Sequence, residues 1–225
     1  MNKLIIIALL LIAHVEIVTA QRVIKSTLLL DDDGSCASSI QEQTDIESFS
    51  WSSFAFPIGE GSVSECLSPI NNIEYGVNNI YDFDQSTAWI AQLNLNDDVW
   101  VEFCFNDENN HTFIYADTYK FSGICYICNG YCKSIKLWQA NSRVKSMDVY
   151  LNDNKICSVV LLDTWKFQIF DLSCFFINRR DSKYLDAPHE IKSGDRLSFH
   201  ITELYKGDRY DEFAISEFLC KGGSH

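Results

Sequence analysis

The feature that most constrains the fold is a succession of short apolar runs that begins at about Ser64. The runs are rich in β-branched and aromatic residues, and clusters of Asn, Asp and Gly separate them. This pattern is typical of strands joined by tight turns in a β-sandwich. It predicts strands over residues 99–105, 122–128, 146–151, 155–162, 165–171, 196–204 and 213–220.

Two predicted turns fix how some of these strands connect. Asn152-Asp153-Asn154 joins two of the runs with residue types that tolerate positive φ, and Ser193-Gly194-Asp195 precedes another run. Helical patterns are scarce, and the chain contains no internal repeat. The sequence therefore predicts an all-β chain.

The N-terminus has the pattern of a secretory signal. Lys3 is followed by an apolar run over residues 4–13 and by small residues before Gln21, where we expect cleavage. The apolar run is too short to cross a bilayer core about 30 Å thick, so we expect no transmembrane anchor. These features predict an exported protein, either secreted or periplasmic.

The remaining chain suits one β domain with an extension. The stretch after the signal is rich in Ser and acidic residues, whereas the strand pattern occupies most of the rest. We divide the chain into a signal peptide (1–20), an N-terminal extension (21–63), a β-sandwich (64–221) and a short tail (222–225).

The net charge disfavours nucleic acid as a partner and leaves open whether the acidic residues bind calcium. The chain has 31 acidic and 18 basic residues, which give a formal charge of −13. Such a charge repels polyanions, so nucleic acid is not an expected partner. Acidic residues either keep an exported protein soluble or supply hard oxygen ligands for calcium.

The nine cysteines favour structural thiols or disulfides. Their odd number leaves at least one unpaired. Cys125, Cys128 and Cys132 fall on a predicted strand and the turn after it, where zinc-knuckle geometry is not implied, and no second pair at ligand spacing completes a set of four. The sequence leaves the pairing open.

Residues 123–151 are dense in directional hydrogen-bonding groups between two apolar strands, which predicts a site at one end of a sheet. No nucleophile–base pair stands among them, so binding is favoured over catalysis. One interpretation is that they contact a ligand, with Asn and Arg bonding hydroxyls and an aromatic ring stacking on a sugar. The other is that they hold the loop and fill the end of the sandwich. The candidate ligand-binding residues are Asn129, Tyr131, Lys133, Trp138, Asn141, Arg143 and Lys145.

This segment resembles the Asn-Gly-Tyr…Asn-x-Arg-x-Lys stretch of a discoidin-like family, which is related to F5/8 type C modules and occurs beside bacterial NAD-glycohydrolase domains. The resemblance spans about residues 64–221 and includes segments 79–89 and 205–218 in the same order. It implies an antiparallel jelly-roll β-sandwich of about eight strands, of the galactose-binding-like type, with binding loops gathered at one end.

The resemblance also implies a structural calcium ion. In many such sandwiches a loop like that at 79–89 and the closing strand hold the ion, and residue-by-residue comparison gives Asp82, Asp84, Thr87 and Glu217 as ligands. Phe83 stands where the common loop has Gly, and a residue with a Cβ disfavours the tight turn at that position. The alternative is that the two aspartates cap a turn and Glu217 pairs with a cation.

The sequence disfavours a catalytic function. Asp211 and Glu212 are adjacent on a predicted strand, so they face opposite ways and cannot flank one bond. A Ser-His-Asp set requires assembling unrelated single residues, and no nucleophile-elbow, zinc-protease or phosphate-loop motif occurs.

The sequence thus favours a secreted, non-catalytic carbohydrate- or cell-surface-binding module. An accessory surface protein that binds another protein is the alternative, and a large exposed apolar patch would distinguish it. An enzyme related to NAD glycohydrolases is disfavoured, because the sandwich occupies most of the chain and residues 21–62 are too few for a catalytic domain.

Overall fold

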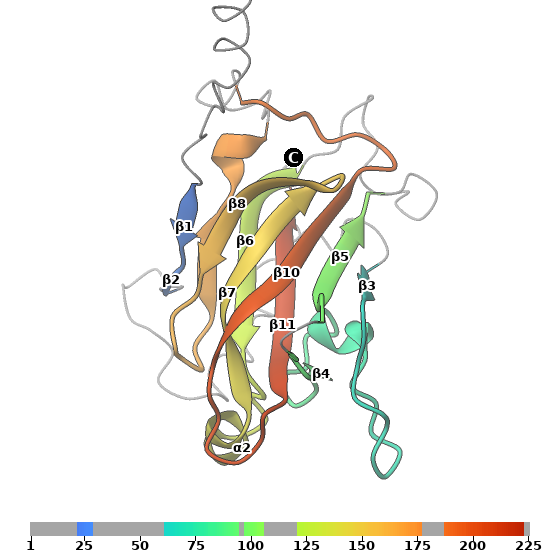
Figure 1. The fold of residues 1–225 in the computed structure, drawn as a ribbon, viewed down its shortest axis with the longest axis vertical. Helices are drawn as coiled ribbons and strands as arrows, with labels where there is room; N and C mark the ends of the chain where they lie inside the picture. Colours follow the sequence, from blue (N-terminus) through green and yellow to red (C-terminus); the bar gives the residue numbers. More distant parts are fainter. Residues whose placement is uncertain (1–21, 29–60, 95–96, 106–120, 177–186, 223–225) are drawn as a thin grey trace, which may run out of the picture.

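The computed structural model describes residues 22–28, 61–94, 97–105, 121–176 and 187–222 (Figure 1). The signal segment expected at 1–20 and most of the expected extension lie outside these residues. None of the helices within the described ranges is long and apolar enough to cross a membrane.

The strands form a sandwich of two layers (Figure 1). The nearer layer in Figure 1 contains, in spatial order, β1 (Val23–Lys25), β8 (Asn154–Val160), β7 (Ser142–Leu151), β10 (Arg196–Tyr205), β5 (Trp100–Cys104) and β3 (Gly61–Val63). The farther layer contains β2 (Thr27–Leu28), β9 (Gln168–Asp171), β6 (Phe121–Asn129), β11 (Phe213–Gly222) and β4 (Trp89–Ala91). The layers meet where β11 pairs in parallel with the start of β7.

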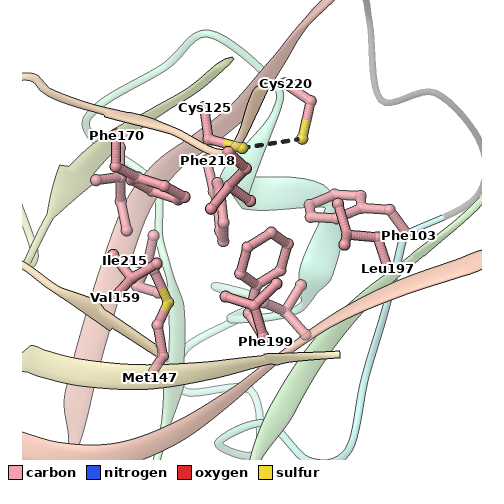
Figure 2. Close-up of a cluster of buried hydrophobic side chains, with 14 of the residues drawn as sticks. Phe103, Cys125, Met147, Val159, Phe170, Leu197, Phe199, Ile215, Phe218 and Cys220 are labelled. Carbon is pink, nitrogen blue, oxygen red and sulfur yellow. Dashed lines mark hydrogen bonds between the residues drawn. The ribbon is translucent and has the colours of Figure 1, made fainter. Parts of the chain in front are cut away.

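The core lies between the layers because alternate residues of each strand point inward. In β5, for example, Val101 and Phe103 are buried while their neighbours are partly exposed. Aromatic rings from both layers meet edge to face at the centre (Figure 2), and the ring centroids of Phe199 and Phe218 are 4.7 Å apart. Such pairs stabilise beyond simple burial by about 0.5–1.5 kcal/mol.

The predicted all-β sandwich is confirmed, and each of the seven predicted strands is present. The predicted turn at Asn152-Asp153-Asn154 is also confirmed, since Asn152 and Asp153 have φ of 50° and 66°. Gly194 has φ of 85°, as its predicted turn requires.

The described chain has eleven strands rather than about eight, because four short strands carry no periodic pattern. Three of these, β1, β2 and β3, come from the segment assigned to the extension, and they pair with β8, β9 and β5, respectively. The structure also contains a helix that the sequence analysis did not predict, α2 (Ile135–Ala140), whose N-cap Ser134 accepts a hydrogen bond from the Leu137 amide.

One end of the sandwich gathers the segments that the sequence analysis singled out. The end of β6, helix α2, the start of β7 and the connection from β10 to β11 all lie at the lower end in Figure 1. Residues far apart in sequence therefore meet there.

Candidate functional site

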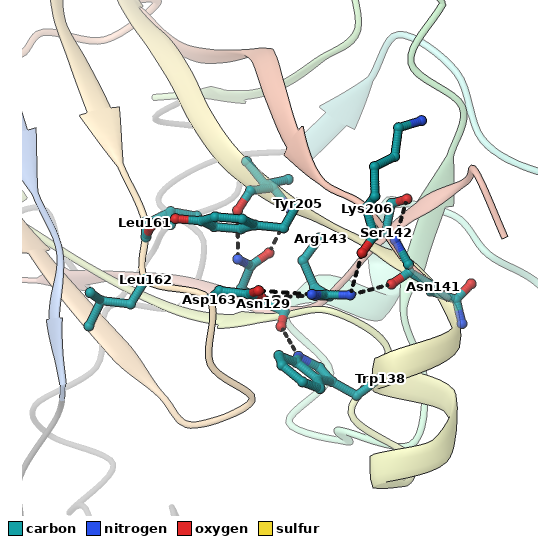
Figure 3. Close-up of polar contacts among 12 residues, drawn as sticks. Asn129, Trp138, Asn141, Ser142, Arg143, Leu161, Leu162, Asp163, Tyr205 and Lys206 are labelled. Atoms are coloured by element: carbon teal, nitrogen blue, oxygen red, sulfur yellow. Dashed lines mark hydrogen bonds and ion pairs between the residues drawn. The ribbon is translucent and has the colours of Figure 1, made fainter. Parts of the chain in front are cut away.

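Arg143, at the start of β7, is the centre of a buried polar network (Figure 3). Its Nε and Nη2 donate to the two carboxylate oxygens of Asp163, at 3.0 and 2.9 Å. Its Nη1 donates to the carbonyls of Asn141 and Lys206, at 3.0 and 3.2 Å. The guanidinium carbon lies 4.5 Å from the centroid of the Trp138 ring, a cation–π arrangement. One side chain thus joins four chain segments.

Asn129 connects β6 to β7 through its side chain rather than its backbone. Its Oδ1 accepts from the Val144 amide at 3.0 Å, and its Nδ2 donates to the Val144 carbonyl at 2.7 Å. Its own carbonyl accepts from Trp138 Nε1 at 2.8 Å. The amide is fully buried, so these bonds satisfy groups that water cannot reach.

Gly130 is required by the close approach of Trp138. Its φ is 111°, a region that residues with a Cβ rarely adopt, and a Cβ there would lie 2.4 Å from Trp138 Cδ1. The glycine therefore allows the indole to reach the Asn129 carbonyl.

The other predicted ligand-binding residues divide by exposure. Tyr131 is buried in a small cluster with Ala88, Ile90 and Ala214, and Asn141 donates to the Leu137 carbonyl at 2.8 Å, which caps α2. Lys133 is exposed, and Trp138 is partly exposed. Lys145 lies farther along β7, where it pairs with Glu203 at 2.6 Å.

The connection between β10 and β11 wraps around the C-terminal end of α2. The amides of Arg209 and Tyr210 both donate to the Ala140 carbonyl, at 3.1 and 2.8 Å, and Ser142 Oγ donates to the Tyr210 carbonyl at 3.1 Å. The Arg209 guanidinium lies 5.1 Å from the Tyr210 ring centroid. The Tyr210 residue is 38% exposed, so this connection presents an aromatic face and a cation to solvent.

The sequence analysis did not identify Arg209 and Tyr210 as site residues. Their segment, 205–218, entered the prediction only as part of the family resemblance. The available signal was an aromatic residue among charged residues beside Gly207, in a connection expected between two strands.

The predicted calcium loop forms a compact turn. Asp82 accepts from the Asp84 amide at 2.8 Å and from Thr87 Oγ1 at 2.7 Å, and Asp84 accepts from the Ser86 amide at 2.8 Å. Phe83 has φ of 60°, so it adopts the left-handed backbone that Gly would take. The substitution of Phe for Gly therefore does not prevent the turn.

Glu217, on β11, is fully buried, and neither of its carboxylate oxygens has a hydrogen-bond partner. Burial is the main cause that raises its pKa, to about 9, and the nearby carboxylates of Asp82 and Asp84 raise it further. The Phe83 backbone amide acts in the opposite direction, although it lacks the geometry of a full hydrogen bond. The side-chain amide of Gln85 is also buried without partners.

These groups fit a hard cation by their chemistry, because they are oxygen donors that include a buried carboxyl group without a hydrogen-bond partner among the described residues. As the side chains stand, no three His, Cys, Asp or Glu residues in the described ranges converge closely enough to hold a metal ion. An ion at this position therefore requires side-chain shifts.

A separate chain of hydrogen-bonding groups lies on β10. Ser198 Oγ is 3.2 Å from His200 Nε2, and His200 Nδ1 is 2.6 Å from Asp98 Oδ1. The fold thus assembles a Ser-His-Asp set from residues that the sequence analysis treated as unrelated. Ser198 is a mid-strand residue paired on both sides, so the ladder uses the backbone amides that an oxyanion hole would need.

Comparison with known proteins identifies the family. The model of the NAD glycohydrolase translocation F5/8 type C domain family matches residues 59–221. The chain belongs to this family. No curated protein matches this F5/8 type C chain by sequence.

Solved structures share the fold of this F5/8 type C domain. The CBM32-1 and CBM32-2 domains of Clostridium perfringens ZmpB superpose with a TM-score of 0.51 at 11% identity, over 91% of this chain and 42% of that chain. The same domains in complex with GalNAc give 0.51 at 10% identity, over 91% and 41%. A longer ZmpB structure that includes the M60 catalytic domain gives 0.53 at 9% identity, over 92% and 17%. The chain spans less than half the length of these structures.

Proposed function

We propose that this F5/8 type C domain is a secreted, non-catalytic module that binds carbohydrate or another cell-surface ligand. The observation that supports this most is the exposed Arg209–Tyr210 pair, held at the end of the sandwich by a buried frame around Arg143. A rigid support with a few exposed polar and aromatic groups is suited to recognition of a polar ligand.

The residues divide into two roles in this proposal. The Tyr210 ring stacks on a sugar face, and the Arg209 guanidinium bonds hydroxyl or carboxylate oxygens. Lys133 and the exposed part of Trp138 extend the contact along α2. Asn129, Tyr131, Asn141 and Arg143 position this surface, because the structure already uses their polar groups or rings internally.

We also propose a structural calcium ion bound by Asp82, Asp84, Thr87 and Glu217. The ion would neutralise the buried Glu217 carboxylate, which has no partner among the described residues. Support for the site comes from the oxygen-rich turn and from Phe83, whose backbone takes the conformation expected of Gly. Its role is to hold the 82–87 turn against β11.

The GalNAc complex of a ZmpB structure with the same fold is consistent with a glycan ligand for this chain. At 10% identity that likeness concerns the fold, so the ligand here is argued from the local chemistry.

One observation favours the alternative of a protein-binding surface module. Ile70 and Ile73 flank a tight turn at Asn71-Asn72, and these isoleucines are 50% and 46% exposed. A protruding apolar tip of this kind suits a protein contact better than a sugar contact.

A glycan-array assay of the purified chain tests the proposal, run in calcium and again with a chelator. We expect saturable binding that falls about tenfold or more in Arg209→Ala and in Tyr210→Ala. Arg196→Ala is the matched control, because this arginine lies at the start of β10, at the opposite end of the sandwich. Folded protein that binds no glycan on the array, while Ile70→Ser/Ile73→Ser abolishes capture of a surface protein, would favour the alternative.

A further inference from the structure

Two buried cysteines flank the Asn129-Gly130-Tyr131 turn. Cys128 lies near the end of β6, and Cys132 follows the turn. Their sulfur atoms are 3.2 Å apart, and both residues are fully buried. Apart from Cys125 and Cys220, at 3.9 Å, no other thiol–thiol hydrogen-bond contact occurs in the part of the chain that the structure describes.

The surroundings of these two thiols exclude two common roles. They lie in an apolar cluster with Tyr126, Phe167 and Leu219. No His or third Cys joins them in a metal-binding group within the described ranges. Burial raises the pKa of Cys128 well above its ordinary value, which disfavours a reactive thiolate in the folded protein.

The hydrogen bonds of the two thiols are poor. The carbonyl of Trp165 is shared by both, at 3.7 Å from the Cys128 sulfur and 3.8 Å from the Cys132 sulfur. Thiols are weak donors, so these contacts contribute little. The positive φ of Gly130 reverses the chain sharply enough to bring the sulfurs into contact.

We propose that Cys128 and Cys132 are joined by a disulfide bond that closes this turn. Each thiol loses a proton, and the pair gives two electrons to a disulfide oxidant such as oxidised glutathione, which takes up the two protons and is reduced to two thiols. A thiolate must attack a sulfur of the oxidant, and burial prevents this in the folded chain. The bond therefore forms before the cluster is packed. In the folded protein the same burial protects the bond from reductants.

The bond restrains the candidate site directly. It ties together the two ends of the turn that contains Asn129 and Tyr131, and Asn129 accepts the Trp138 indole N–H. The closed loop is short, so a local restraint is the main effect rather than a large gain in global stability. The inference stands whether or not the domain binds glycans.

Peptide mapping tests the proposal on the full chain. The reduced, denatured chain is refolded in a mixture of reduced and oxidised glutathione, quenched with acid and alkylated. Chymotrypsin cleaves after Tyr126 and Tyr131, which places Cys125, Cys128 and Cys132 on different peptides. We expect the 127–131 peptide to be linked to the peptide that begins at Cys132. Recovery of both cysteines in alkylated form, or a link from Cys128 to Cys125 or Cys220, would overturn the proposal.

Two further measurements sharpen the result. Cys128→Ser is expected to expose one additional alkylatable thiol, at Cys132, whereas Cys104→Ser is the matched control that leaves the 128–132 link intact. Tris(2-carboxyethyl)phosphine is expected to leave the bond intact in native buffer and to cleave it in guanidinium. Equal reduction under both conditions would show an accessible bond and would contradict the buried pairing. The wild-type map decides the matter even where a variant fails to fold.

Discussion

Arg143 and Asp163 form a bidentate ion pair in which two guanidinium nitrogens each bond one carboxylate oxygen. The arginine side chain is 8% exposed and the aspartate side chain 38% exposed, so the pair lies at the boundary of the core. The third guanidinium nitrogen, Nη1, donates to the backbone carbonyls of Asn141 and Lys206. The pair therefore fixes the end of the sandwich on which the proposed ligand surface is built.

Replacing Arg143 with Ala is expected to lower the free energy of unfolding by about 2–3 kcal/mol, after allowance for the partly exposed Asp163. The variant leaves the Asn141 and Lys206 carbonyls without this donor and removes the cation from the Trp138 ring. Urea unfolding measures the change. Arg143→Lys should recover only a small part, since lysine cannot form the two parallel bonds. Lys145→Ala, at an exposed pair, should leave the urea midpoint nearly unchanged, because solvent screens that pair.

Gly130→Ala is expected to destabilise the domain by roughly 2–4 kcal/mol, because the new Cβ meets Trp138 and the backbone is left-handed. Gly194→Ala is the matched control: its φ is also positive, but no atom lies within 4 Å of the new Cβ. That control should cost only about 1–2 kcal/mol. Equal midpoints of urea unfolding for the two variants would show that the contact with Trp138 is not required.

The Glu217→Gln variant tests whether Glu217 binds calcium or is only a buried carboxyl group. The wild-type chain should rise in melting temperature when calcium is added, and the variant should not, because a neutral amide cannot replace the charge. In chelator the variant should be at least as stable as the wild type near pH 7, since the buried carboxyl is then protonated. A wild-type melting temperature unaffected by calcium would refute the site.

The pH dependence of stability without calcium follows from the same group. The Glu217 pKa is about 9 in the folded chain and 4.5 as its ordinary value, so the folded state binds the additional proton between these pH values. The stabilising contribution is fully present below about pH 4.5 and is lost as the pH rises through about 9. The Glu217→Gln variant should not show this loss of stability with rising pH, because the amide does not titrate. Urea midpoints of the two proteins in chelator, measured from pH 5 to pH 9, should therefore diverge with increasing pH.

The Ser198–His200–Asp98 set is expected to be unreactive. A fluorophosphonate probe should not label Ser198, because a mid-strand serine has no adjacent free backbone amides to stabilise an oxyanion. Mass spectrometry of the treated chain checks this. Labelling that disappears in both Ser198→Ala and His200→Ala would show that the set acts as a hydrolase.

The parts of the fold that the sequence predicted have strong local patterns. Strands β5, β8 and β9 alternate buried and more exposed residues, β11 is an apolar run buried from Phe213 to Cys220, and Asn152-Asp153 tolerates positive φ. Strands β1 to β4 have three or fewer residues, too few for a period to be visible. Helix α2 has six residues and no buried face, so its sequence shows no helical periodicity and is typical of a loop.

The candidate site was predictable in composition but not in its internal contacts. Asn129, Trp138, Asn141 and Arg143 do meet at one end of the sandwich. Their partners are mostly backbone carbonyls and Asp163, a residue that follows β8 and carries no distinguishing motif. Tertiary contacts of this kind are set by the arrangement of strands rather than by local sequence.

Strand β11 is the last of the described strands, yet it pairs with β6, β4 and β7 and so connects both layers. It also contributes Phe213, Ile215 and Phe218 to the core. These pairings give the domain a high contact order, and such topologies fold slowly. During synthesis the earlier strands must therefore wait, without a completed core, until residues 213–222 have left the ribosome.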